Sequence, residues 1–184
     1  FGYAVVGRGY IAQAAVLPSF AHARRNSSLH AIVSGKVEKL NELGDKYRVP
    51  VRATYDDYDR VLHEVDAVYI CTPNSEHEDY VVRAARAGKH VLCEKPLAVT
   101  QEECHRMIKA AKQGGIKIMT AYRLHFEPLF LEGLDIVRSG KIGKVLMAKA
   151  WDVQLRDNIG HKNDSPVPSG VDYETWIGPA AYLS

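Results

Sequence analysis

Apolar and polar positions follow a repeating pattern over roughly the first 120 residues, and this pattern predicts alternating strands and helices. Short apolar runs predict strands at residues 3–6, 29–33, 51–54, 67–72, 90–93 and 116–119. The mixed segments between them predict helices at residues 10–23, 39–47, 56–64, 75–87 and 102–113. The alternative for the first helix is a bend or an early end at Pro18. Ser75 with Glu78 and Thr100 with Glu103 have capping-box spacing at two of the helix starts. Such regular alternation is typical of an α/β protein with a doubly wound parallel sheet.

The pattern changes after residue 121. Residues 127–139 predict one more helix and residues 144–153 one long strand, whereas the remainder to residue 184 is rich in Pro, Gly, Asp and Asn and has no clear period. One helix and one strand cannot enclose a core. We therefore expect residues 1–121 to form the sheet domain, and residues 122–184 to be the beginning of an incomplete α+β second domain.

The first predicted strand leads directly into Gly7-Arg8-Gly9-Tyr10-Ile11-Ala12. Gly7 would permit a tight turn from strand to helix, and Gly9 would let the backbone approach a pyrophosphate closely. A helix that begins near Tyr10 and Ile11 would direct its free N–H groups and its positive dipole end at the phosphates. This turn predicts a dinucleotide-binding Rossmann fold; the alternative is a tight strand–helix turn that binds nothing.

The end of the second predicted strand indicates which dinucleotide would bind. An Asp or Glu there would hydrogen-bond the adenosine ribose and favour NAD. This chain instead has Ser34, with Lys36 and Lys39 just beyond it. A hydroxyl and two cations suit a 2′-phosphate, so we expect a preference for NADP, with NAD as the alternative. The competing interpretation is a solvated helix start that carries lysines.

Two further candidate stretches follow predicted strands, at residues 72–77 and at Glu94-Lys95-Pro96. Ligands of doubly wound sheets bind beyond the carboxyl ends of the strands, so these stretches and the glycine turn should share one edge of the sheet. Lys95 is the candidate for proton transfer to or from a substrate hydroxyl. The alternative is a surface lysine whose apolar stem lies along a loop.

Composition excludes several classes of protein. The net charge of +2 argues against a nucleic-acid partner, and the absence of a run of about 18 apolar residues argues against a membrane span. Three cysteines without CxxC spacing predict reduced thiols in a cytoplasmic protein. Eight histidines without HExxH spacing give no sign of a metal site, and we expect none.

Three stretches together resemble the Gfo/Idh/MocA family of oxidoreductases: Gly7–Ala12, Cys71–His77 and Ala87–Pro96. The last stretch, with its Ala-Gly-Lys-His-Val and Glu-Lys-Pro runs, is more specific than the glycines. The similarity continues through Ala121–Pro128 and so covers nearly the whole chain. The stretch from Ser34 to Lys39 looks most like the glucose-fructose oxidoreductase branch of the family, which uses NADP.

The resemblance implies roles for the residues after the fifth predicted strand. Lys95 would be the family's catalytic lysine and would also contact the cofactor, and Glu94 would lie against the nicotinamide ribose. The bond between Lys95 and Pro96 would be cis.

The resemblance also implies roles for residues after the fourth strand and at the domain crossover. Thr72, Pro73, Asn74 and His77 would border the nicotinamide half of the cofactor. Arg123, next to Tyr122, would face cofactor or substrate; the alternative for Arg123 is a linker residue paired with Glu127.

One departure from the family pattern concerns the second domain. The resemblance and the usual sizes of domains imply a protein about twice as long as this chain. Its second domain would complete the active site with an Asp-x-x-x-His motif. No such motif after a Gly-rich run occurs in this chain. The chain therefore resembles the cofactor half of an enzyme, and we expect slow turnover or none from this half by itself.

The function expected from the sequence is hydride transfer between NAD(P), preferably NADP, and a sugar, polyol or related hydroxyl compound, with Lys95 as acid and base. We expect a small-molecule substrate and, for a full-length protein, a homo-oligomer. The alternatives are a non-catalytic dinucleotide-binding sensor or regulator, which has no need of Lys95, and a structural α/β domain with an empty pocket.

Overall fold

The computed structural model describes residues 1–151, 163 and 165–174. The chain divides into two compact units, Phe1–Lys141 and Ile142–Ser184. The expected domain boundary at residue 121 stays a prediction. In the described part of the chain, no helix has the length and apolar character needed to cross a membrane.

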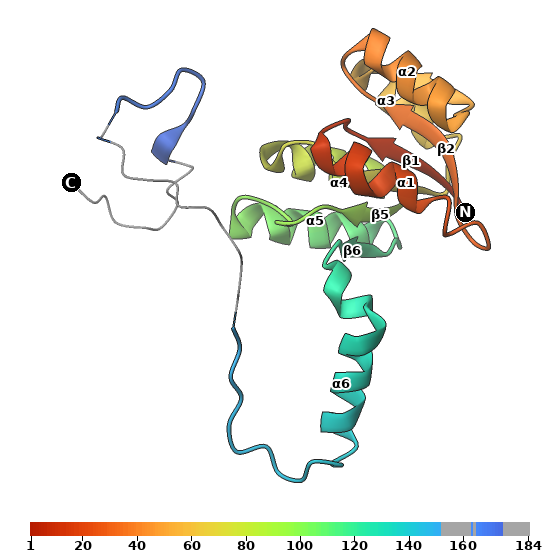
Figure 1. The fold of residues 1–184 in the computed structure, drawn as a ribbon. Coiled ribbons are helices and arrows are strands. Elements are labelled where there is room, and N and C mark those ends of the chain that lie inside the picture. Colours follow the sequence, from red (N-terminus) through yellow and green to blue (C-terminus); the bar gives the residue numbers. More distant parts are fainter. Residues whose placement is uncertain (152–162, 164, 175–184) are drawn as a thin grey trace. The chain divides into compact units, whose positions relative to one another are not determined.

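The first unit is built on a parallel sheet of six strands (Figure 1). In chain order they are β1 (Gly2–Val6), β2 (Ser28–Val33), β3 (Val51–Ala53), β4 (Ala67–Ile70), β5 (His90–Cys93) and β6 (Ile118–Thr120). The spatial order is β3-β2-β1-β4-β5-β6, and every neighbouring pair is parallel. This is the strand order of the Rossmann fold, which confirms the predicted fold class.

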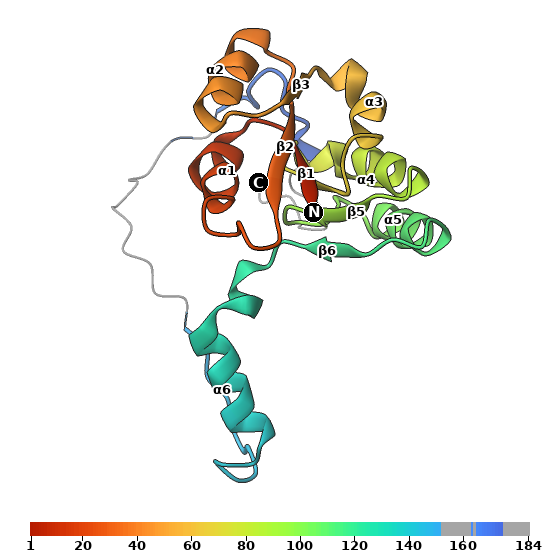
Figure 2. The same ribbon diagram turned by 90° about the vertical axis from the view of Figure 1, so that its right-hand side faces the viewer.

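Helices cover both faces of the sheet. They are α1 (Leu17–Ser19), α2 (Val37–Tyr47), α3 (Tyr58–Leu62), α4 (His77–Arg86) and α5 (Gln101–Gln113). A further helix, α6 (Pro128–Arg138), follows the last strand and covers neither face (Figure 1). Short 3₁₀ segments lie at Tyr55–Asp57, Asn74–Glu76 and Arg123–Phe126. Figure 2 shows α1 and α2 on one face and α3, α4 and α5 on the other.

The core follows from the alternation of side chains along the strands. In β1, Val5 packs with Ile32 on the α1 and α2 face, and its neighbours Ala4 and Val6 pack with Val68 on the opposite face. All five side chains are fully buried. Strands covered on both faces are nearly continuously apolar, which is why the sequence pattern located them.

The helix after the glycine turn is shorter than predicted. A π-helical turn at Ala12–Val16 runs into α1, which ends at Ser19 rather than near residue 23. The Ser19 hydroxyl donates to the Val16 carbonyl at 2.7 Å, and the following N–H groups of Ala21 and His22 bond three residues back. This tight turn ends the helix one residue after Pro18.

One predicted strand and one predicted cap are wrong. Residues 144–151 form no strand, because a strand needs a hydrogen-bonded neighbour and none of the described strands pairs with them; residues 152 and 153 lie outside the described part. The Thr100 hydroxyl caps α5 by accepting from the N–H of Glu103 at 3.2 Å, as predicted. The Ser75 side chain caps no helix, and Glu78 instead pairs with Arg106 of α5.

Candidate cofactor site

The glycine turn packs tightly against the end of β4. Gly7 has a φ of +98°, and a Cβ built on it would lie 2.6 Å from the Cys71 carbonyl oxygen. The Gly7 N–H donates to the Val33 carbonyl of β2 at 2.9 Å. A Cβ on Gly9, by contrast, would meet nothing closer than 3.9 Å. The fold itself therefore requires glycine at position 7, whereas the space beside Gly9 stays open.

A cavity of about 450 Å³, which we call the glycine cavity, opens over this turn. Its walls are Gly7–Gly9, Gly35 after β2, Tyr55 after β3 and Cys71–Pro73 after β4. Four adjacent strands thus contribute their carboxyl ends, where doubly wound sheets bind ligands. The Thr72 hydroxyl beside this cavity is buried and has no hydrogen-bond partner among the described residues.

A second cavity of about 650 Å³, the lysine cavity, lies on the other side of the same turn. Ile11 of the turn, Glu94 and Lys95 after β5, and Arg123 beyond β6 all line it. The structure thus brings together four of the residues selected from the sequence. Tyr69 of β4 also lines this cavity.

The Glu94 carboxylate is held from two sides. The Tyr69 hydroxyl donates to Oε1 at 3.0 Å, and the backbone N–H of Lys95 donates to Oε2 at 3.3 Å. Burial and the neighbouring carboxylate raise the pKa of Tyr69 above its usual value, so the phenol keeps its proton and remains a donor. The Lys95–Pro96 bond is cis, as expected. The Lys95 side chain is exposed and forms no ion pair within the described part of the chain.

His77 lies between two loops rather than in either cavity. Its ring is fully buried, with Nδ1 3.0 Å from the Pro96 carbonyl and Nε2 3.1 Å from the Thr72 carbonyl. The ring therefore links the loops that follow β4 and β5. Its expected contact with a cofactor stays a prediction.

Two of the residues expected to favour NADP, Ser34 and Lys39, are not free to contact a 2′-phosphate. The Ser34 side chain is fully buried, and its hydroxyl has no partner among the described residues. Lys39 forms an ion pair with Glu42 at 2.7 Å on the surface of α2, whereas Lys36 is exposed at the helix start. A 2′-phosphate that bound Lys39 would have to compete with Glu42.

Two other expected residues, Tyr10 and Asn74, are exposed and line neither cavity. Conversely, the sequence did not indicate Gly35, Tyr55 or Tyr69 as site residues. Tyr55 directly follows β3, so its place at the carboxyl edge of the sheet was a usable signal. Tyr69 gave no such signal, because it lies inside an apolar strand and resembles a core residue.

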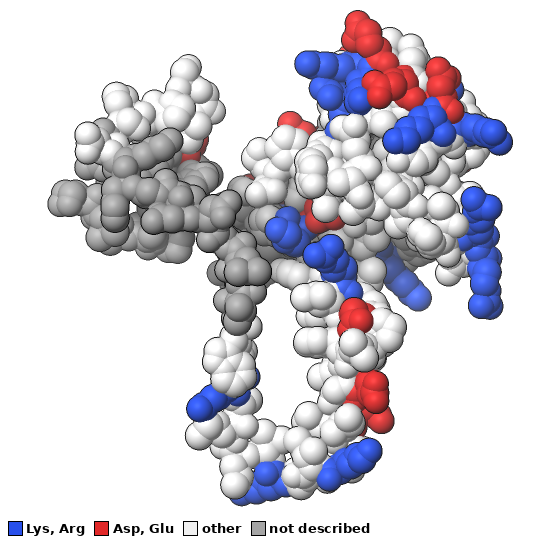
Figure 3. Space-filling model, in the orientation of Figure 1, with Lys and Arg blue, Asp and Glu red and all other residues white. Residues whose placement is uncertain are grey.

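Surface charge over this unit is mixed. In Figure 3, acidic and basic side chains stand side by side around α2 on the face shown. Within the described ranges, no group of three or more His, Cys, Asp or Glu residues could hold a metal ion.

Comparison with known proteins identifies the family. The sequence pattern of the Gfo/Idh/MocA oxidoreductases, described as an oxidoreductase family with an NAD-binding Rossmann fold, matches residues 1–122. The chain belongs to this family. The match ends just after β6, so it covers the whole sheet and most residues of both cavities.

Relatives within the family include sugar oxidoreductases. An uncharacterized oxidoreductase of Rhizobium meliloti is 34% identical over 182 residues, which cover 97% of this chain and 54% of that protein. The NADP(+)-dependent D-xylose 1-dehydrogenase of Haloarcula marismortui is 31% identical over 146 residues, which cover 78% and 41%. The crystal structure of aldose-aldose oxidoreductase from Caulobacter crescentus, complexed with glycerol, superposes with a TM-score of 0.74 at 45% identity and covers 78% and 44%. The chain thus spans about half the length of the relatives it matches.

Proposed function

We propose that this chain is the cofactor-binding half of an NAD(P)-dependent oxidoreductase that acts on a hydroxyl or carbonyl group of a sugar or polyol. The observation that carries the proposal is that one glycine turn borders both cavities. A dinucleotide that crossed the turn at Gly9 would place its adenosine half in the glycine cavity. Its nicotinamide half would then lie beside Glu94 and Lys95.

The site's own features fit a dinucleotide. The open space beside Gly9 suits a pyrophosphate. The fixed Glu94 carboxylate can accept hydrogen bonds from ribose hydroxyls. These residues would hold NAD(P), which supplies or accepts the hydride.

Lys95 would move the proton that accompanies the hydride. As an ammonium it would donate a proton to a substrate carbonyl oxygen during reduction, and as an amine it would accept the hydroxyl proton during oxidation. No described carboxylate pairs with Nζ, so its donors and lone pair are available to substrate. The names of the relatives that act on xylose and on aldoses support a sugar or polyol as the substrate class.

We propose NADP as the preferred cofactor. The loop after β2 has no Asp or Glu between Ser34 and Val37, and Lys36 is exposed there. The NADP(+)-dependent relative is consistent with this choice. Because Ser34 is buried and Lys39 is paired with Glu42, Lys36 is the candidate that remains among these three residues for a 2′-phosphate.

The test of function is the variant Lys95→Met. The matched control is Lys117→Met, because Lys117 is an exposed lysine directly before β6, whereas Lys95 lies beyond the carboxyl end of β5. In an enzyme assay of the full-length protein with sugars and polyols, Lys95→Met should lower turnover by about 100-fold or more while NADPH binding stays intact. Lys117→Met should behave like wild type. Unchanged turnover in Lys95→Met would remove Lys95 from its role, and cofactor binding without turnover of any substrate by the wild type would favour the sensor.

A further inference from the structure

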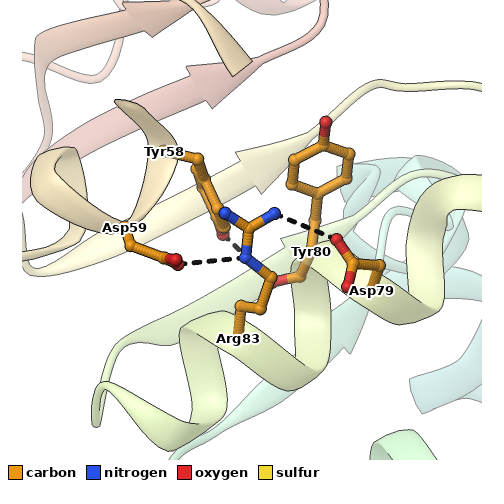
Figure 4. Close-up of polar contacts among 5 residues, drawn as sticks. All are labelled: Tyr58, Asp59, Asp79, Tyr80 and Arg83. Carbon is orange, nitrogen blue, oxygen red and sulfur yellow. Dashed lines mark hydrogen bonds and ion pairs between the residues drawn. The ribbon is translucent and has the colours of Figure 1, made fainter. Parts of the chain in front are cut away.

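Arg83 lies on α4, outside both cavities, and holds two tyrosines and two aspartates around its guanidinium group (Figure 4). Its Nε donates to Asp59 of α3 and its Nη1 to Asp79 of α4, each at 3.0 Å. The guanidinium carbon lies 4.8 Å from the ring centroid of Tyr58 and 5.6 Å from that of Tyr80. Arg83 thus ties α3 to α4 through charge and through cation–π contacts.

The two tyrosines at Arg83 lead to the glycine cavity. The rings of Tyr58 and Tyr80 pack edge to face at 5.0 Å, and the Tyr58 hydroxyl donates to the Tyr80 carbonyl at 3.0 Å. Tyr80 in turn packs against Tyr55 at 5.8 Å, and Tyr55 is a wall of the cavity. We call Tyr55, Tyr80 and Tyr58 the tyrosine ladder.

The position of the Tyr55 ring is narrowly defined. It packs on Tyr80, and it lies so close to Gly35 that a Cβ built there would be 3.2 Å from its Cε2. Tyr58 is fully buried and Tyr80 nearly so, and burial raises the pKa of Tyr80 to about 12. The ladder therefore stays neutral at physiological pH, and packing rather than charge holds Tyr55 in place.

We propose that Arg83 is a positioning residue for the adenosine half of the cofactor and acts through the tyrosine ladder on Tyr55. This inference rests on the proposed function, because it assumes that a dinucleotide enters the glycine cavity. Tyr55 is carried by the short segment Tyr55–Asp57, directly before α3. By holding α3 against α4, Arg83 keeps this segment and its ring at a fixed distance from the glycine turn. Preorganisation of this kind lowers the entropy lost when a ligand binds.

The experiment compares Arg83→Met with Arg106→Met in the purified protein. Arg106 is a matched control because it also ties α4 to a neighbouring helix, through Glu78, and it contacts no tyrosine in the described structure. The probes are 2′,5′-ADP and ADP-ribose, and calorimetry gives the affinity of whichever one the wild type binds more tightly. Arg83→Met should weaken that affinity by about three- to ten-fold, and Arg106→Met should leave it unchanged. Arg83→Lys keeps the positive charge but loses the planar guanidinium group, so its affinity for the probe should lie between those of Arg83→Met and wild type. If Arg83→Met does not fold, Arg83→Lys is the variant that tests the inference.

A double-mutant cycle tests the route through the ladder. If Arg83 acts through Tyr55, then adding Arg83→Met or Arg83→Lys to Tyr55→Leu should weaken the probe no further than Tyr55→Leu alone. Fully additive losses would overturn the inference. The inference would also be overturned if the Arg83 variants bound the probe as tightly as wild type and showed only a lower melting temperature, as Arg106→Met would. A wild type that binds neither probe nor NADPH nor NADH would remove the proposed function and this inference with it, whereas unchanged affinity in the Arg83 variants removes the inference alone.

Discussion

The hydroxyl of Tyr69 and the carboxylate of Glu94 lie 3.0 Å apart and join the middle of the sheet to the end of β5. Tyr69 belongs to β4, so this bond links β4 to the residue that directly follows β5. The second oxygen of Glu94 accepts from the Lys95 N–H. The carboxylate next to the proposed acid and base therefore has little freedom to turn.

Tyr69→Phe should impair catalysis without unfolding the protein. The variant removes one hydrogen bond to a charged group, which is worth roughly 1.5 kcal/mol or more, so kcat/KM should fall about ten-fold. Steady-state kinetics measure this. Tyr3→Phe is the control, since Tyr3 packs on Phe20 in the same sheet face and donates no hydrogen bond in the described structure. Equal kcat/KM for both variants would show that the bond does not position Glu94.

The two glycines of the turn should respond differently to alanine. Gly7→Ala places a Cβ 2.6 Å from the Cys71 carbonyl at a φ of +98°, which should destabilise the fold by about 2 kcal/mol or more. Gly9→Ala has space in the protein, so its stability should match wild type, but the added methyl group should block a pyrophosphate. Urea unfolding measures the first effect and NADPH titration the second. A stable Gly7→Ala, or tight NADPH binding by Gly9→Ala, would contradict this account of the turn.

The three cysteines should differ in reactivity. Cys71 and Cys93 are buried, and burial raises the pKa of Cys93 to about 12 and the pKa of Cys71 further still. Cys104 of α5 is partly exposed. Iodoacetamide at neutral pH should therefore label Cys104 in the native protein and all three cysteines in urea, because the thiolate is the reacting form. Mass spectrometry of tryptic peptides reads the result, and rapid native labelling of Cys93 would show that β5 is not packed as described.

Tyr58 should contribute to stability in a way that depends on pH. Burial raises its pKa in the folded state, whereas the unfolded phenol ionises near pH 10. Because the folded pKa is the higher one, the contribution is fully present below about pH 10 and is lost as the pH rises above it. Tyr58→Phe also loses the bond to the Tyr80 carbonyl, so it should be about 1 kcal/mol less stable than wild type at neutral pH. Urea unfolding at about pH 7 and pH 11 should show this difference shrinking at the higher pH; a constant difference would argue against a buried phenol.

The sheet could be predicted because its strands are apolar on both faces. The apolar run from His90 to Cys93 predicted both ends of β5 correctly. In β1, Val5 faces one side of the sheet and its neighbours Ala4 and Val6 face the other, as the pleat of a strand requires. The run at residues 144–153 is equally apolar, but it is no strand over its described part, because a strand also needs a partner. An apolar run indicates that a segment can be buried, but it does not show which other segment would pair with it as a strand.

The site was predicted where backbone geometry dictates residue type, and was missed where tertiary contacts decide. Gly7 is required by a positive φ, and that constraint is visible in a glycine motif. Tyr69 lies inside an apolar strand, and it reaches the lysine cavity only because the neighbouring strands leave its side chain there. The pair of Lys39 and Glu42 has i,i+3 spacing on α2, so it was a usable signal in the sequence. Glu78 pairs with Arg106 of another helix, which the sequence does not indicate.

The most direct test of the central claim is a crystal structure of the protein with NADPH. We predict the pyrophosphate over Gly9, the adenosine beside Tyr55, and the nicotinamide close enough to Lys95 that a substrate oxygen could lie about 3 Å from Nζ. A nicotinamide that lies away from Lys95, or a dinucleotide bound elsewhere than the two cavities, would contradict the account.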